Sequence, residues 1–118
     1  MTSVEHVRSV LAPLPRSYEV VVYDRIKWRV GSIVYVAFSR DEEMMGFAFP
    51  KEEREALVES DPATFSFPRQ SDMRFNWVMA HTAMLDDIEA TEYVLDAWAM
   101  VVPKKVSRGW FEQGFVVP

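Results

Sequence analysis

The amino-acid sequence predicts an α+β fold in which helices flank an antiparallel sheet. Two observations support this prediction. Segments with helical periodicity stand near both ends and in the middle of the chain, and segments typical of β-strands are grouped between them instead of alternating with them. Short connections separate the strands, which favours hairpins and antiparallel pairing. The 118 residues fit one domain, so we expect a single unit over residues 1–118.

The first element is predicted to be a short amphipathic helix. Its apolar residues recur at spacings of three and four, as one buried stripe requires. Thr2 and Glu5 have the spacing of a capping box at its start, and Pro13 and Pro15 end it. The stripe consists of Val4, Val7, Leu11 and Leu14.

Four strands are expected next. Valine and aromatic residues dominate the first, and polar and apolar residues alternate in the second, as in a half-buried strand. The third is mostly β-branched or aromatic, which predicts deeper burial. Gly31-Ser32 and the acidic residues 41–43 supply turns. The expected strands are residues 18–23, 25–30, 33–38 and 44–49.

A second helix is expected from Pro50 to about Glu59. Proline is tolerated at the first helical position, and Glu52 and Glu53 in the first turn suit the helix dipole. The sequence Ser-Asp-Pro at 60–62 ends it. Irregular chain is expected after this helix, up to residue 76.

A fifth strand is predicted over residues 77–82. Its alternation places Trp77, Met79 and His81 on one face. Trp77 is also expected on a buried face, together with Trp28 of the second strand.

The last regular element is predicted to be a helix that Asp86 caps and Pro103 ends, with Glu89 three residues after the cap. Its expected buried stripe is Ile88, Thr91, Leu95, Trp98 and Val102. Residues 107–118 are expected to form a C-terminal tail. Trp110, Phe111 and Phe115 in this tail either dock on the domain or bind a partner.

Composition excludes several classes of site. The chain has no cysteine, so it has no disulfide, thiolate zinc site or cysteine nucleophile. We see neither a membrane-spanning run nor a signal peptide, and we expect a cytoplasmic protein without membrane contact. The net charge of −5 and the pI of about 5.0 argue against indiscriminate binding to phosphate backbones.

Several runs of the sequence together resemble the MmcQ/YjbR-like family: KEEREALVESDPATFSFP, NWVMAH and a helix ending in LDAWAMVVPKK. The resemblance extends from about Val4 to Lys105. Two positions depart from the family pattern, namely Ser32 where a lysine is usual and Asn76 where a glycine is usual. The resemblance implies an α+β fold similar to CyaY or to type III secretion chaperones. It also implies the DNA-binding label that the family's double-wing geometry has attracted, and no catalytic residue.

Charge is distributed unevenly along the chain. Five basic residues against two acidic ones fall between positions 16 and 40, whereas the last predicted helix carries five acids and no base. Arg25, Lys27 and Arg29 project from one face of a strand, and Lys104 and Lys105 follow the last helix. These five residues are the candidate nucleic-acid-binding set. The alternative is a strand that its charges keep soluble.

No catalytic or metal site is expected. The only histidines are His6, on the polar side of the first helix, and His81. His81 and Thr82 are adjacent in a strand and therefore point to opposite faces, which argues against a hydroxyl–imidazole pair. No metal-binding or phosphate-binding motif occurs, so we expect no cofactor. The sequence therefore predicts a non-enzymatic binding module that binds DNA weakly or, alternatively, acts as a protein-interaction or chaperone-like module. It does not determine the oligomeric state.

Overall fold

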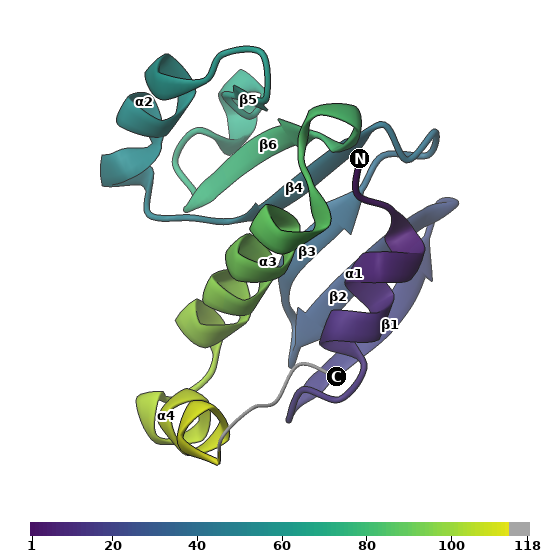
Figure 1. The fold of residues 1–118 in the computed structure, drawn as a ribbon, viewed down its shortest axis with the longest axis vertical. Helices are drawn as coiled ribbons and strands as arrows, with labels where there is room; N and C mark the ends of the chain where they lie inside the picture. Colours follow the sequence, from purple (N-terminus) through teal and green to yellow (C-terminus); the bar gives the residue numbers. More distant parts are fainter. Residues whose placement is uncertain (114–118) are drawn as a thin grey trace.

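The computed structural model describes residues 1–113, which form a six-stranded sheet and four α-helices (Figure 1). The predicted α+β class with an antiparallel sheet is confirmed. The helices are α1 (Val4–Leu11), α2 (Lys51–Ser60), α3 (Asp87–Val101) and α4 (Lys104–Glu112). The strands are β1 (Ser17–Val22), β2 (Arg25–Val30), β3 (Ile33–Phe38), β4 (Met44–Ala48), β5 (Phe65–Ser66) and β6 (Trp77–His81).

The sheet has the strand order β1-β2-β3-β4-β6-β5. Hairpins join the first four strands. Tyr23 and Asp24, between β1 and β2, both have positive φ (50° and 63°), as the commonest two-residue hairpin turn requires. Gly31 adopts φ 60° in the next turn, as its place between two strands predicts. The chain then leaves the sheet through α2 and returns as the short edge strand β5 and as β6, which lies between β4 and β5.

One face of the sheet is covered by α1 and α3, which pack side by side (Figure 1). The core lies between this helical layer and the sheet, and Trp28, Val36, Phe47 and Val78 form one continuous row across it because each is paired with the next. All four side chains are almost completely inaccessible to solvent. The opposite face of the sheet carries neither α1 nor α3.

The stripe by which α3 enters the core differs from the prediction. Ile88 is 75% exposed, whereas Ala90, Val94 and Ala97 are fully buried beside the correctly predicted Trp98 and Val102. The helix is therefore rotated relative to the predicted stripe. Small side chains at the contact let its backbone approach β3 and β4 closely, and this steric fit outweighs the preference for burying the larger isoleucine.

The start of α1 also differs from the prediction. Ser3, and not Thr2, is the N-cap, and its Oγ accepts a hydrogen bond from the backbone N–H of His6 at 3.1 Å. Thr2 is buried instead, and its backbone N–H donates to the carbonyl of Thr82.

A further helix follows the one that was expected to be the last. Pro103 ends α3 and also stands at the N-cap of α4, which takes up Lys104–Glu112. Residues 107–112 are therefore helical and not part of a tail. Trp110 packs on Trp98 with ring centroids 5.6 Å apart, so α4 docks on the end of α3. Phe111 is 42% exposed, and Phe115 lies outside the described residues.

Candidate ligand-binding face of the sheet

A row of paired residues crosses the uncovered face of the sheet. Lys27 pairs with Ala37, Ala37 with Gly46, and Gly46 with Met79. Directly opposite residues of antiparallel strands share a face, and these positions alternate with the core residues of the same strands. This row therefore points away from α1 and α3, and we call this side the open face.

The open face contains a cavity with a volume of about 860 Å³, within the range of small-ligand sites. Side chains from β2, β3, β4 and β6 form its floor, and the segment between β5 and β6 forms one wall. At one end of the sheet the cavity also reaches Met100 and Val101, the last two residues of α3. The lining combines cations, aromatic rings and methionines. It includes Arg25, Lys27, Met44, Phe75, Trp77 and Met79.

The structure brings the predicted basic residues together only in part. Arg25 and Lys27 both line the cavity, and neither makes an ion pair within residues 1–113. Arg29 lies on the same side of β2, beyond the cavity lining, and its buried Nε has no hydrogen-bond partner in that part of the chain. Lys104 and Lys105 are exposed in the first turn of α4 and do not line the cavity.

Trp77 is the cavity residue that sequence reasoning placed wrongly. The side chain was expected in the core, yet it is half-buried on the open face. A Cβ atom added at Gly46 would meet Nε1 and Cζ2 of the Trp77 indole at 2.6 Å. One edge of the indole thus occupies the space that a side chain at position 46 would need. The sequence signal for this contact was Gly46 itself, because a glycine inside a strand often marks a place where another group approaches the backbone closely.

Buried Arg54 of α2 holds the wall of the cavity. Its Nη1 donates to the carbonyls of Phe75 (3.0 Å) and Trp77 (2.9 Å), and its Nη2 donates to that of Met73 (2.8 Å). Three charge-assisted hydrogen bonds from one planar group tie this segment to α2. Arg54 is therefore a positioning residue for Phe75 and Trp77.

Asn76, the departure from the family pattern, strengthens the same connection. Its Oδ1 accepts a hydrogen bond from the backbone N–H of Lys51 at 3.0 Å. Pro50 at the N-cap of α2 supplies no side-chain cap, so Asn76 satisfies an N–H group that the helix start leaves unpaired.

Two lining residues between β5 and β6 carry opposite charges that neutralise each other. Arg69 donates to the carboxylate of Asp72 at 2.9 Å. Arg25 and Lys27, on the β2 side, are therefore the lining cations without an ion pair in the described chain. Arg74 lies beside the lining, with its guanidinium 4.7 Å from the centroid of the Phe75 ring.

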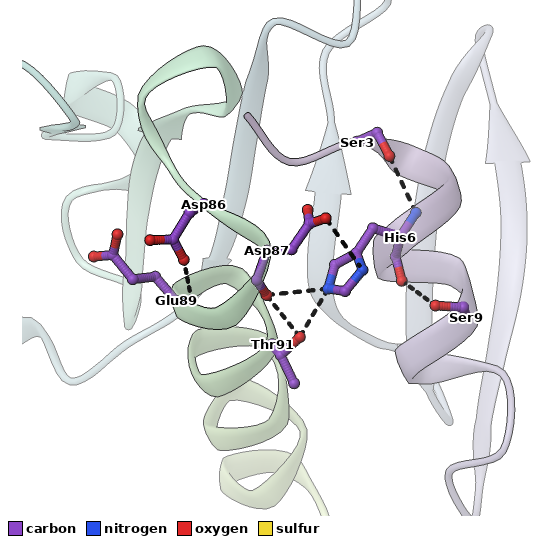
Figure 2. A network of polar contacts seen from close by, with 7 residues as sticks. All are labelled: Ser3, His6, Ser9, Asp86, Asp87, Glu89 and Thr91. Carbon is purple, nitrogen blue, oxygen red and sulfur yellow. Dashed lines mark hydrogen bonds and ion pairs between the residues drawn. The ribbon is translucent and has the colours of Figure 1, made fainter. Parts of the chain in front are cut away.

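His6 belongs to a polar network between α1 and α3 (Figure 2). Its Nε2 lies 2.8 Å from Thr91 Oγ1 and 3.1 Å from the carbonyl oxygen of Asp87, and its Nδ1 lies 3.8 Å from the Asp87 carboxylate. The hydroxyl of Thr91 donates to the carbonyl of Asp87, so it accepts from the imidazole. A general base must take the hydroxyl proton, and here the direction is reversed. The network therefore connects two helices and does not activate a nucleophile.

His81 lies beside a second cavity, of about 540 Å³, together with Asp41, Glu42 and Glu43. The Asp41 carboxylate accepts hydrogen bonds from the Ser39 hydroxyl and the Glu43 backbone N–H, which lower the pKa of Asp41. Thr82 was expected in the same strand as His81, but β6 ends at His81, and Thr82 begins a 3₁₀ turn and lines the same cavity. Its hydroxyl donates to the carbonyls of Glu42 and Glu43 and forms no pair with His81. Within residues 1–113, His81 is paired with no carboxylate.

Within residues 1–113, no cluster of three or more histidine, aspartate or glutamate side chains is arranged to hold a metal ion. Over the same residues, no helix has the length and apolar character needed to span a membrane.

Comparison with known proteins agrees with this fold. A family model described as YjbR matches residues 12–100. The crystal structure of Deinococcus radiodurans protein DR2400, which carries the family-model domain DUF419, superimposes with a TM-score of 0.75. Its sequence is 19% identical, and the match covers 92% of this chain and 88% of that one. No curated protein matches the chain. Since the family model spans most of the sequence, the chain belongs to the YjbR family.

Proposed function

We propose that this chain is a non-enzymatic binding module whose open face binds nucleic acid, with Arg25, Lys27 and Arg29 contacting phosphates. One observation carries the proposal. Arg25 and Lys27, which make no ion pair within residues 1–113, line the same cavity as Trp77 and Phe75. Cations beside aromatic rings are the combination that proteins use to bind nucleic-acid strands. The DNA-binding label implied by the family resemblance and a cytoplasmic location are part of the proposal.

Binding is expected to be weak and to depend steeply on salt. The net charge of −5 opposes approach to a polyanion, and about three basic side chains are available at the site. Three phosphate contacts on duplex DNA predict a loss of about 40-fold in affinity between about 50 and about 200 mM salt.

The proposal is tested by fluorescence anisotropy of labelled duplex and single-stranded DNA at these two salt concentrations. The variant Arg25→Ala/Lys27→Ala/Arg29→Ala should lose binding. The matched control, Lys104→Ala/Lys105→Ala/Arg108→Ala, removes the same charge from α4 and should retain it. Equal losses in both variants would show that overall charge, and not the open face, governs binding. Absence of binding at low salt would refute the proposal.

A second candidate function is binding of apolar protein segments. Met44, Met79 and Met100 all line the cavity, and methionine side chains adapt to varied apolar partners. Phe75 beside them is 50% exposed. A chaperone-like module of this kind would suppress aggregation of an unfolded protein at all salt concentrations, and Met79→Ser would weaken the effect. This salt independence separates it from the first candidate.

A further inference from the structure

We infer that the open-face cavity binds an unpaired nucleobase of a single strand, stacked beside Trp77, while Arg25, Lys27 and Arg29 follow the phosphates. This inference rests on the proposed function and narrows it from nucleic acid in general to single strands. It also assigns a role to the apolar part of the cavity, which phosphate contacts do not explain.

The cavity contains both kinds of group that a nucleotide requires. Trp77 and Phe75 offer aromatic surface for a base, and Met79 offers a polarisable side chain beside them. The indole N–H of Trp77 donates to no group within the described residues, and the Nε1 edge of the ring lies against Gly46. A base paired inside a duplex cannot enter such a cavity, because its faces are covered by its neighbours. The cavity therefore selects unpaired bases.

The spacing of the cations fits a strand running along β2. Arg25, Lys27 and Arg29 occupy alternate positions of one strand, so consecutive side chains leave the backbone about 6.8 Å apart. This distance is comparable to that between neighbouring phosphates of an extended single strand. On the opposite wall Arg69 is neutralised by Asp72, and the guanidinium of Arg74 lies over the Phe75 ring, 4.7 Å from its centroid. The row of three cations on β2 is therefore the extended track for phosphates, and the aromatic part of the cavity is the place for a base.

The position of the Trp77 ring depends on the absence of a side chain at Gly46. Any side chain at position 46 would displace the indole, since a Cβ would stand 2.6 Å from two of its ring atoms. The substitution Gly46→Ala therefore moves the stacking surface without removing a cation or an aromatic ring. It separates base stacking from charge.

The experiment measures binding of labelled oligothymidine and of a duplex of equal length by anisotropy at low salt. Wild type should bind the single strand at least about ten-fold more tightly than the duplex. Trp77→Leu and Gly46→Ala should each weaken single-strand binding about ten-fold and leave duplex binding unchanged, because one base stack is lost. Trp77→Phe should retain most of the affinity. Phe111→Leu, an exposed aromatic on α4 outside the cavity, is the matched control and should bind like wild type.

The outcomes separate phosphate binding from base binding. If Trp77→Leu and Gly46→Ala bind the single strand like wild type while the triple-alanine variant does not, phosphate binding stands and the nucleobase site is refuted. If no DNA binds, both proposals fail. If Trp77→Leu does not fold, the tryptophan emission of wild type tests the nucleobase site instead. Oligothymidine must quench it, and the quenching must be reduced in Trp77→Phe.

Discussion

Tyr35 is a polar side chain that is fully buried in the core. The register between β2 and β3 shifts at Trp28 and Arg29, which pair with Val36 and Val34 and leave Tyr35 as the extra residue of a bulge. Its hydroxyl is hydrogen-bonded to the hydroxyl of Ser17 at the start of β1. Burial raises the pKa of Tyr35 to about 12, because a phenolate there would lose its hydration, and the bond to Ser17 opposes this only in part.

This pKa predicts a loss of stability at high pH. The unfolded tyrosine ionises near pH 10 and the folded one at about 12, so between these values the unfolded chain binds fewer protons. The contribution is fully present below about pH 10 and falls by about 1.4 kcal/mol per pH unit until about pH 12. Tyr35→Phe should cost about 1 kcal/mol near neutral pH, where it leaves Ser17 unpaired, and should abolish this loss.

Urea unfolding of wild type and Tyr35→Phe across the same pH range measures the effect. The free energies of unfolding of the two proteins should converge as the pH rises above about 10. Parallel curves would show that Tyr35 ionises equally easily in both states.

At the scale of the elements, two adjacent hydroxyl side chains with opposite energetic roles stand immediately before α1. Ser3 accepts the hydrogen bond of the N-cap, whereas the buried Oγ1 of Thr2 has no partner in the described chain. A satisfied cap stabilises a helix, and a buried unpaired hydroxyl destabilises the fold.

Substitutions at these two neighbours should therefore change stability in opposite directions. Ser3→Ala should lower the free energy of unfolding by about 1 kcal/mol, because the N–H of His6 loses its acceptor. Thr2→Val replaces the unpaired hydroxyl by a methyl group of similar size and should raise it by up to about 1 kcal/mol. Thermal unfolding of both variants provides the measurement. Destabilisation by Thr2→Val would show that the hydroxyl has a partner in solution.

At the scale of the whole molecule, α4 completes the core at the end of α3. Trp98 is fully buried, donates its indole N–H to the carbonyl of Pro15 at 3.0 Å, and contacts the rings of Trp110 and Phe111. One side chain thus joins α3, α4 and the connection between α1 and β1.

Truncation of the two α4 aromatics should have unequal effects. Trp110→Ala should cost about 2 kcal/mol or more, since it opens Trp98 to water, whereas Phe111→Ala, already 42% exposed, should cost less than about 1 kcal/mol. Chemical denaturation and the wavelength of tryptophan emission measure both effects. Equal and small losses would mean that α4 does not protect the core.

Charge is also separated across the whole molecule. The acids of α3 lie in the helical layer, and the cations of β2 lie on the open face of the sheet. Because of this separation, a protein with a net charge of −5 presents a locally positive surface. Within α3, burial raises the pKa of Asp96, and the neighbouring Glu92 adds to the effect.

The sequence by itself determined the class of the fold, the order of nearly all elements and the alternation of β2 and β6. These features follow from local periodicity and turn chemistry, which are properties of neighbouring residues. The candidate site could be predicted only in part. Arg25, Lys27 and Arg29 were found because they alternate within one strand, whereas Phe75, Gly46 and the cavity that they border were not.

Only the tertiary structure decided which face of each element is covered. The rotation of α3 depends on how closely its alanines approach β3 and β4, and the helical state of α4 is accompanied by the docking of Trp110 on Trp98. Trp77 has the composition of a core residue, but β6 pairs with β4 so that its ring lies over Gly46 on the open face. Each of these outcomes depends on contacts between residues far apart in the chain, which local sequence patterns do not encode.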